Sequence, residues 1–485
     1  MIKPLPSPSV SPSAMNLLLK TLSPFLFVTY SLMSPRLNSA ELGARENPPA
    51  SDQTPWRQFA AMTPGQVRAY EIEVMRKVAD LALLPPIINT APGAQYDAVN
   101  LEFGMTPKIE RTRGGRLWCA WLGGEDGPRA FLLAATSDDN GATWSRPRFV
   151  IDSHSAFLPV PRTTIGGVLW LDPRGRLWLF SSQGMNYFDG REGVWAAFCD
   201  NPDAAHPAWS SPQRIGHGNL LNKPIVLSTG EWLMPSYLLQ YKTDGASATA
   251  MDGTTVRPYA GPCTAYLTDP RCPGPHTWEL FPELDPLRGV NLLVSVDQGQ
   301  TWTCQSTVRF PDPDWHEPMV VEKKDGSLWM LVRVKGGIME TTSTDRGKTW
   351  TTPALPAVIR HPQSRFHLRR LASGRILLIK HGEKIDRHRG RSQLSAWLSE
   401  DDGRSWKGGL MLDERDAVSY PDVTEAADGT LYIAHDRERI KLGEILLSRV
   451  TEADILAGQL RSPGSALKIL ISRPLKGKAP DRKAN

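Results

Sequence analysis

The feature that most constrains this chain is a hairpin pattern that recurs six times between residues 106 and 436. Each copy has an extended run, a turn with glycine, and a second run rich in apolar and aromatic residues. The turn glycines are Gly115, Gly175, Gly230, Gly326, Gly374 and Gly429. Most lie roughly 50 residues apart, and a Pro- and Gly-rich insertion at about 240–290 lengthens one interval. Repeats of this length are typical of propeller blades, so we predict an all-β, six-bladed β-propeller.

A second motif recurs within these units, with the pattern Ser-x-Asp-x-Gly-x-Thr/Ser-Trp. It reads SDDNGATW, SVDQGQTW, STDRGKTW and SEDDGRSW at 137–144, 295–302, 343–350 and 399–406, and 199–212 resembles a degenerate copy. We expect a turn between the two outer strands of a blade. Its Asp would accept backbone N–H bonds, its Gly would adopt the turn conformation, and its Trp would pack between sheets. These acidic residues therefore predict a structural turn rather than a catalytic or calcium site.

The first 40 residues predict a targeting segment. An apolar run is followed by small and polar residues, which resembles a secretory signal with cleavage near Ala40. An uncleaved membrane anchor is the alternative, although Pro24 interrupts the short apolar run. We therefore predict a secreted or periplasmic protein without an integral membrane domain.

The rest of the chain divides by composition. We expect an N-terminal extension at 41–99 that contains an amphipathic helix at 63–84. The propeller is expected to span 100–474, followed by a basic disordered tail at 475–485. Either 466–474 or the segment that precedes the first hairpin would supply the last strand of blade 6 and close the ring.

Composition argues against several partner classes. The formal net charge is +5, much of it in the C-terminal tail, where solvation explains it better than nucleic-acid binding. The five cysteines show no metal-ligand spacing, although Cys263 and Cys272 could form a local disulfide in an oxidising compartment. We expect no metal, no cofactor and no nucleic-acid partner.

Hairpin geometry places a set of polar residues at one end of the channel. Residues equally distant from a hairpin tip lie side by side, so the strand ends opposite the turns meet at the channel mouth. Three blades contribute ionisable or phenolic residues there: Glu317, Arg333, Arg365, His381, Tyr420 and Asp436. Among strands rich in Val, Leu and Trp, this concentration indicates a functional site. A polar channel mouth without chemistry is the alternative.

The octapeptides, known as Asp-boxes, and the six-blade count resemble the sialidase (neuraminidase) superfamily, in its BNR-repeat branch, over about residues 100–450. HEPMVVEKKDGSLWMLVR resembles the segment with the Glu that activates the nucleophile and an Arg of a carboxylate-binding triad, which implies Glu317 and Arg333. RSQLSAWLSEDDGRSW resembles the segment whose leading Arg completes that triad, which implies Arg391. SYPDV resembles the stretch with the nucleophilic tyrosine, which implies Tyr420.

Blade 1 departs from the family pattern. The usual Arg-Ile-Pro motif is replaced by GMTPKI, with Met105 where the first Arg would stand, and Arg365 is the candidate substitute. The family's general acid is an Asp that follows the inner hairpin of blade 1. Here GGEDGPR offers Asp126 or, as the alternative, Glu125.

The resemblance implies an exo-glycoside hydrolase that removes a terminal acidic sugar, sialic acid or a related one, from a glycan. A nearby carboxylate would draw the proton from Tyr420, since sialidases use a tyrosine nucleophile. Arginines would bind the substrate carboxylate through paired hydrogen bonds. Two alternatives remain: a polysaccharide lyase or other glycosidase on the same scaffold, and a non-catalytic glycan-binding propeller. We expect His316, His367 and His381 to be structural.

Overall fold

The computed structural model describes residues 61–158, 160–240, 243–244, 247–248 and 280–476. The chain separates into two units, Met1–Tyr70 and Glu71–Asn485. The predicted signal segment and the Cys263–Cys272 pair lie outside the described residues. Cys119, Cys199 and Cys304 are free thiols.

An N-terminal helix precedes the strands. α3 (Pro64–Ala79) continues into the 3-10 turn η1 (Asp80–Leu83) and ends before Pro85. The helix begins at a capped position, because the backbone N–H of Gln66 donates to the Thr63 hydroxyl at 3.3 Å. In the described part of the chain, no helix combines the length and the apolar character needed to cross a membrane.

The first three blades follow one another in the chain. Blade 1 consists of β1 (Met105–Arg111), β2 (Leu117–Gly123), β3 (Phe131–Ser137) and β4 (Phe149–Ile151). Blade 2 consists of β5 (Arg162–Leu171), β6 (Leu177–Met185), β7 (Gly193–Cys199) and β8 (Gln213–His217). Blade 3 consists of β9 (Ile225–Val226), β10 (Trp232–Leu238), β13 (Gly289–Ser295) and β14 (Thr303–Val308). The insertion lies between β10 and β13 and carries β11 (Thr243–Asp244), β12 (Ser247–Ala248) and η4 (Pro282–Leu287).

The last three blades repeat the arrangement. Blade 4 consists of β15 (Pro313–Glu322), β16 (Leu328–Val334) and β17 (Gly337–Ser343). Blade 5 consists of β18 (His367–Arg370), β19 (Ile376–His381), β20 (Ser392–Ser399) and β21 (Lys407–Asp416). Blade 6 consists of β22 (Val418–Glu425), β23 (Leu431–Arg437), β24 (Glu444–Val450) and β25 (Ala466–Ser472), with α5 (Glu452–Ala457) before its last strand.

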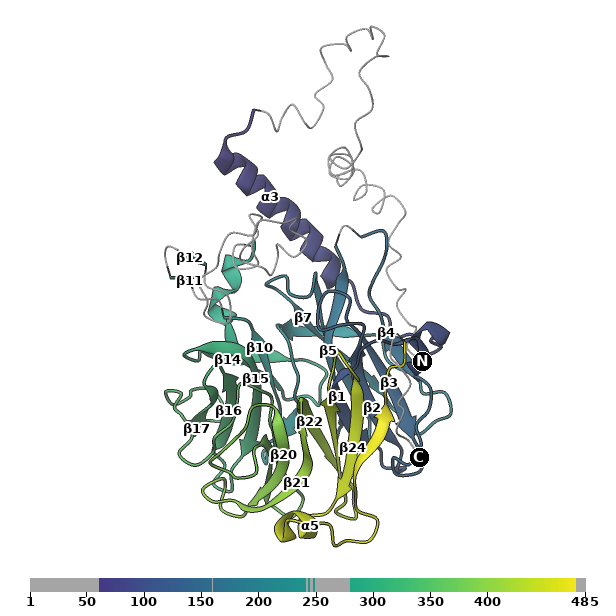
Figure 1. Ribbon diagram of the computed structural model, residues 1–485. Helices are drawn as coiled ribbons and strands as arrows, with labels where there is room; N and C mark the ends of the chain where they lie inside the picture. The colour runs from purple at the N-terminus through teal and green to yellow at the C-terminus, as the bar shows by residue number, and fades with distance from the viewer. Residues whose placement is uncertain (1–60, 159, 241–242, 245–246, 249–279, 477–485) are drawn as a thin grey trace, which may run out of the picture. The chain divides into compact units, whose positions relative to one another are not determined.

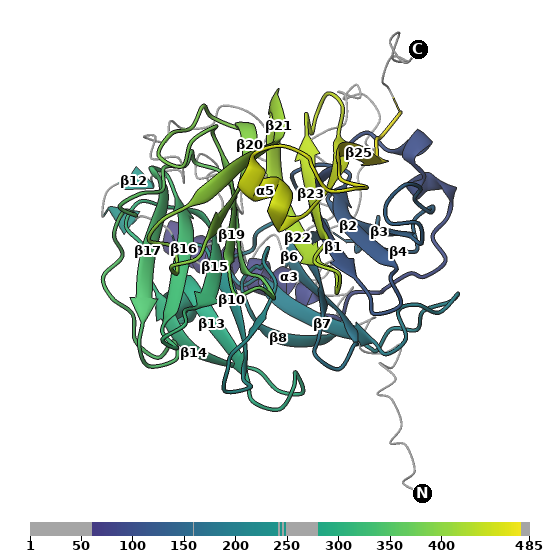
Figure 2. The ribbon, with the colours of Figure 1, turned by 90° about the horizontal axis from the view of Figure 1, so that it is seen from below.

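These antiparallel sheets follow one another around a ring in chain order, as Figures 1 and 2 show, and the predicted six-bladed propeller is confirmed. Apolar side chains from facing sheets fill the space between neighbouring blades. Ile109 and Trp121 of blade 1, for example, pack with Ala434 and Leu447 of blade 6. Of the two candidates for the closing strand, 466–474 is the one that joins blade 6, as β25.

The repeated octapeptides form the predicted turns. In the first copy, Asp139 accepts the backbone N–H of Thr143 at 2.9 Å and its hydroxyl at 2.6 Å. Ser137 accepts the Gly141 N–H at 2.9 Å, and the Trp144 indole donates to the Gly141 carbonyl at 3.2 Å. The hydrogen bonds from Thr143, with one from Ser137, lower the pKa of Asp139 to about 2. The same pattern of Asp and Ser bonds recurs at Asp297, Asp345 and Asp401.

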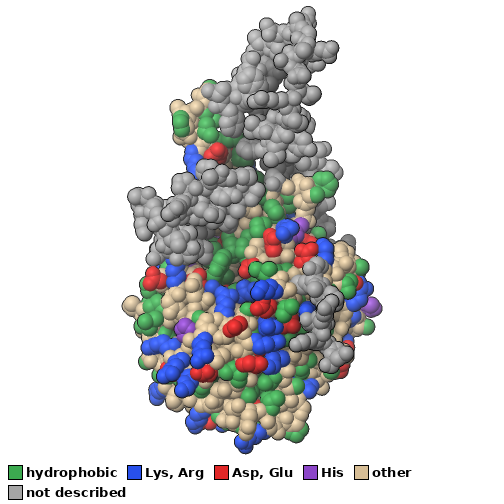
Figure 3. Space-filling model, viewed as in Figure 1, with side chains coloured by type: hydrophobic (Ala, Val, Ile, Leu, Met, Phe, Trp, Pro, Cys, Tyr) green, Lys and Arg blue, Asp and Glu red, His purple; other side chains and the backbone are tan. Residues whose placement is uncertain are grey.

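Charges of both signs are mixed on the outer surface. Figure 3 shows Lys and Arg side chains beside Asp and Glu over one face of the propeller. Arg375 lies 2.9 Å from Glu400 within blade 5, and Lys468 lies 2.7 Å from Glu414 between blades 5 and 6. Exposed pairs of this kind stabilise a protein by at most about 1 kcal/mol each.

Candidate active site

The inner strands of blades 1, 4 and 6 are irregular at the channel mouth. The pairing of β1, β15 and β22 with the next strand shifts there, as in a β-bulge. At these shifts Thr106, Glu317 and Tyr420 have φ angles of 54°, 45° and 51°. Such left-handed conformations in non-glycine residues cost roughly 1–3 kcal/mol and cluster at functional sites. The strained conformations therefore single out one mouth position in each of three blades.

The bulges correct the simple pairing expected for these hairpins. Regular pairing would place Glu317 opposite Arg333, but His316 is the residue paired with Arg333. The shift arises because two residues on a bulged strand face one residue on its partner.

Tyr420 and Glu317, the predicted nucleophile and its helper, are in direct contact. The Tyr420 hydroxyl donates to Glu317 Oε1 at 2.9 Å. Both side chains are buried, with 6% of Tyr420 and 1% of Glu317 exposed. Arg333 Nη1 lies 3.1 Å from both carboxylate oxygens of Glu317, and its Nε lies 2.6 Å from Asp314. A phenol thus meets a carboxylate that is held in place by a guanidinium.

This contact sets the protonation states. Burial alone would raise the pKa of Glu317, but the charge and hydrogen bonds of Arg333 outweigh it, so the pKa lies below its ordinary value. Burial and the Glu317 charge raise the pKa of Tyr420 to about 12, although nearby arginines oppose the rise. At neutral pH the carboxylate is therefore ionised and the phenol keeps its proton.

This pair lines a cavity of about 90 Å³ together with three guanidinium groups, those of Arg333, Arg391 and Arg439. Arg391 donates to Ser419 at 3.5 Å, and the guanidinium carbon of Arg439 lies 4.5 Å from the centre of the Tyr420 ring. Sequence reasoning missed Arg439. The available signal was its position three residues after Asp436, where the chain continues outward from the predicted mouth. Blade 1 contributes Met105 to the same cavity.

The prediction that Arg365 faces the substrate is wrong. Its side chain is fully buried, and its donors bond to the side chain of Asn222 and to the carbonyls of Leu221 and Pro421. The physical reason is that β18 begins only at His367 and carries no bulge that would turn Arg365 toward the cavity. Arg365 instead stabilises the channel interior.

Asp422 joins several blades inside this channel. One carboxylate oxygen accepts the Ile109 N–H of blade 1 at 3.0 Å and lies 3.5 Å from Lys223. The other lies 3.5 Å from Arg365. Lys108, also missed from sequence, lies 6.0 Å from the centre of the Tyr420 ring, and burial lowers its pKa to about 7.

Asp126, the predicted general acid, lines the same cavity as Tyr420. It accepts a hydrogen bond from the Tyr187 hydroxyl at 2.6 Å and lies 3.6 Å from Arg439. The alternative, Glu125, forms an ion pair with Arg129 at 2.7 Å and is not among the residues that line the cavity. Of the two candidates, Asp126 is therefore the one that lines the cavity.

A histidine holds the loop that carries Asp126. His154 bonds through Nδ1 to Asp152 at 2.6 Å and through Nε2 to the Pro128 carbonyl at 2.9 Å. A carboxylate and a carbonyl both accept, so the protonated, positively charged ring, which donates from both nitrogens, satisfies both partners. Burial opposes that charge, but the Asp152 and Pro128 bonds outweigh it and the pKa of His154 is raised.

Two of the three histidines expected to be structural have protein partners for their rings. His381 bonds to His361 at 3.1 Å and to the Val418 carbonyl at 2.9 Å, and His316 bonds to Gln240 at 3.0 Å. Burial lowers the pKa of His381 to about 3 and that of His316 to about 4. At neutral pH both rings are uncharged, and their hydrogen bonds hold the residues around the channel mouth in place.

The sequence matches a family model described as a BNR repeat-like domain, over residues 115–259 and 271–433. The chain belongs to this family. No curated protein matches the chain significantly.

Several solved sialidase structures share the fold. An intramolecular trans-sialidase from Ruminococcus gnavus, in complex with oseltamivir carboxylate, aligns with a TM-score of 0.53 at 14% identity, over 76% of this chain and 98% of that one. A leech intramolecular trans-sialidase aligns with a TM-score of 0.53 at 13% identity, over 75% and 70%. The NanB sialidase of Streptococcus pneumoniae aligns with a TM-score of 0.50 at 13% identity, over 78% and 69%. These similarities confirm a sialidase-like propeller fold.

Proposed function

We propose that this BNR-repeat protein is an exo-glycoside hydrolase that releases a terminal acidic sugar, sialic acid or a related one, from glycans. The observation that carries the proposal is the 2.9 Å hydrogen bond from the Tyr420 hydroxyl to Glu317, in a cavity lined by three guanidinium groups. In keeping with the predicted signal segment, we also propose that the protein is secreted or periplasmic. Amino-terminal sequencing of the exported protein would test cleavage near Ala40.

The proposed reaction has two steps. The Tyr420 oxygen attacks the anomeric carbon while its proton passes to Glu317, and Asp126 protonates the departing glycosidic oxygen. Water then attacks the glycosyl–tyrosine bond, assisted by the deprotonated Asp126, and the phenol regains its proton from Glu317. The high pKa of Tyr420 requires that its proton leave as the new bond forms.

The arginines define the substrate class. Arg333, Arg391 and Arg439 line one cavity, and guanidinium groups bind a carboxylate through paired hydrogen bonds. A substrate whose carboxylate sits beside the reacting carbon would repel a carboxylate nucleophile, whereas a neutral phenol avoids this repulsion. The cavity therefore suits a sugar with an acidic group at or near its anomeric centre.

The decisive experiment is a hydrolysis assay with fluorogenic α-sialosides and uronic-acid glycosides, on wild type and on Tyr420→Phe. We expect turnover of at least one acidic glycoside by wild type and loss of turnover in Tyr420→Phe, which keeps its fold by circular dichroism. An unsaturated product that absorbs in the near ultraviolet would instead identify a lyase. Glycan binding without turnover in both proteins would identify a binding propeller and overturn the proposal.

A further inference from the structure

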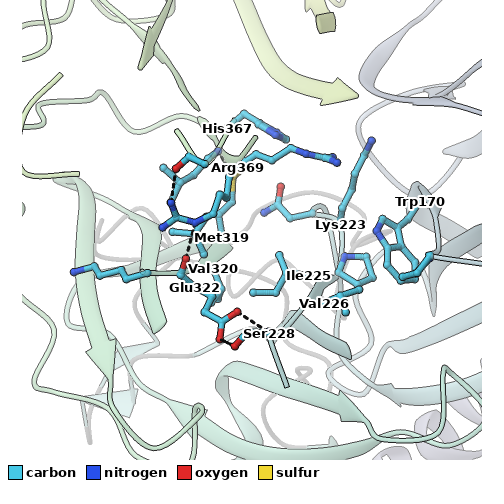
Figure 4. A pocket seen from close by; sticks show the side chains of 18 of the residues that line it. Trp170, Lys223, Ile225, Val226, Ser228, Met319, Val320, Glu322, His367 and Arg369 are labelled. Carbon is cyan, nitrogen blue, oxygen red and sulfur yellow. Dashed lines mark hydrogen bonds between the residues drawn. The ribbon is translucent and has the colours of Figure 1, made fainter. Parts of the chain in front are cut away.

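A second cavity lies at the opposite end of the blades from Tyr420. Its volume is about 590 Å³, and it is lined near the inner turns of blades 2, 3, 4 and 5, by residues such as Pro173, Ser228, Gly326 and Gly374 (Figure 4). Neither the predicted mechanism nor the octapeptides use these residues. Cavities of about 300–1,000 Å³ with a few polar groups are typical of small-molecule sites.

Much of the wall of this cavity is apolar. Ile225 and Val226 of β9 lie near its centre in Figure 4, and Met319 and Val320 of β15 border it on another side. Leu171 of β5 adds further apolar surface. A ligand with an apolar body would bury surface here, at about 25 cal/mol for each Å² removed from water.

Most charged groups in the lining already have protein partners. Lys223 donates to Glu110 at 2.9 Å and to the Val423 carbonyl at 2.9 Å. Glu322 accepts both the N–H and the hydroxyl of Ser228, each at 2.7 Å. The charges of Lys223 and Glu322 are therefore already paired within the protein and are not available to bind a ligand.

Asp172 and Arg370 are satisfied in the same way. Asp172 accepts from Arg176 at 2.7 Å and from the Trp178 indole at 2.9 Å. Arg370 donates to the Glu322 carbonyl at 2.8 Å and to Asp402 at 2.6 Å. Each of these two charges is therefore compensated by a neighbour.

Three other residues of the lining differ from these four: Lys323, which lies 5.5 Å from the centre of the Trp329 ring, and His367 and Arg369 of β18. His367 and Arg369 alternate along one strand and so share a face, and Figure 4 shows Arg369 reaching toward Lys223. His367 is 96% buried, lies 3.5 Å from Asp422, and makes no hydrogen bond through either ring nitrogen to any described residue. Within the described chain, Arg369 has no hydrogen bond or ion pair, so its guanidinium donors are available to a ligand.

We propose that this cavity binds a small organic carboxylate with an apolar body. Arg369 would bind the carboxylate with its planar pair of donors, and the His367 ring would supply a further hydrogen bond. The apolar walls from β9 and β15 would contact the body of the ligand. Inorganic phosphate shares the negative charge but has no apolar body, so it should bind more weakly.

This site is separate from the proposed active site, although one side chain touches both. Asn222 lines the cavity, and its amide donates to the carbonyls of Glu317 and Pro318 at 3.1 and 2.6 Å. Tyr420 does not line it. Binding in the cavity should therefore survive the Tyr420→Phe change that removes turnover.

The test is isothermal titration calorimetry of the full chain with benzoate, its neutral isostere benzamide, and inorganic phosphate. We expect benzoate to bind with a Kd of about 1 mM or tighter, and both other probes to bind about tenfold more weakly or not at all. Arg369→Gln should weaken benzoate binding about tenfold or more, as loss of a charge-assisted bond does. Arg404→Gln, a matched change at an exposed arginine of blade 5, should leave binding unchanged.

Four outcomes would overturn the proposal. The first three are no benzoate binding by wild type, equal binding of benzoate and benzamide, and equal binding by wild type and Arg369→Gln. The fourth is phosphate binding as tight as benzoate, because the apolar walls would then contribute nothing. If Arg369→Gln fails to fold, Ile225→Phe provides a second variant that narrows the cavity and should reduce benzoate binding. Tyr420→Phe should bind benzoate like wild type, which separates this result from the hydrolase proposal.

Discussion

The acidic residues at the two ends of the blades differ in where their partners lie: within the same turn at one end, and in another blade at the other. At the octapeptide turns, Asp139 bonds to Thr143, four residues away in the same turn. At the channel mouth, Glu317 of blade 4 bonds to Tyr420 of blade 6 and to Arg333. The first pattern recurs in four blades and completes each turn locally, whereas the second occurs once and depends on the closed ring. In this molecule the repeated acids complete turns, and the proposed function gives Glu317 a chemical role.

The largest effect should follow from Glu317→Gln. An amide cannot take up the phenolic proton, so we expect kcat to fall about 10²–10⁴-fold. The variant retains a hydrogen-bonding partner for Tyr420 and Arg333, so it should remain folded by circular dichroism. Stopped assays with a fluorogenic α-sialoside would measure the effect, and unchanged kcat would remove Glu317 from the mechanism.

The arginines offer a second contrast. Arg439→Gln removes a guanidinium that lines the cavity, and we expect KM for an acidic glycoside to rise about 10- to 100-fold with little change in melting temperature. Arg365→Gln removes a fully buried guanidinium and should instead destabilise the fold, by about 3–5 kcal/mol. Steady-state kinetics would measure KM, and thermal melts would measure stability, for both variants. A stability loss in Arg439→Gln without a KM effect would contradict it.

A smaller, pH-dependent effect should come from His154. Its folded pKa lies above the unfolded value of about 6.5, so its contribution to stability is fully present below pH 6.5. That contribution is lost as pH rises through the folded pKa. The charges that face it are Asp152 and Glu125. Thermal melts of wild type and His154→Gln should therefore differ most at acidic pH and converge at alkaline pH; a constant difference would show that His154 acts only through packing.

The smallest effect should follow from Asp345→Asn, at an octapeptide turn of blade 4. Its carboxylate is exposed and bonds only within its own turn among the described residues. We expect a small decrease in melting temperature and no change in kcat or KM. Loss of activity comparable to that of Glu317→Gln would break the distinction between repeated and unrepeated acids.

The fold could be predicted because its determinants are local and repeated. Turn glycines and octapeptides recur along the chain, and each forms within a few residues of its own strand. The mouth positions of Glu317 and Tyr420 also followed from hairpin register, since their strands are innermost. Register could not predict the bulges in their strands, at which these two residues adopt positive φ angles.

The arginines show where sequence reasoning ends. The position of Arg365 in its hairpin predicted a side chain at the channel mouth. The side chain lies in the channel interior instead, because backbone carbonyls and Asn222 accept its hydrogen bonds there. Arg439 lies beyond the end of β23, in a loop that is not part of the repeated pattern. Its position over Tyr420 depends on the path of that loop, which pattern alone does not determine.

Asp422 has a consequence for how the molecule assembles. It belongs to the last blade to leave the ribosome, yet it contacts Ile109, Lys223 and Arg365 from three earlier blades. Lys223 already has Glu110 of blade 1 as a partner at 2.9 Å, but Arg365 gains the Asp422 carboxylate only when blade 6 arrives. Completion of the ring therefore also brings the carboxylate that faces Arg365 at the axis, so both happen together during biosynthesis.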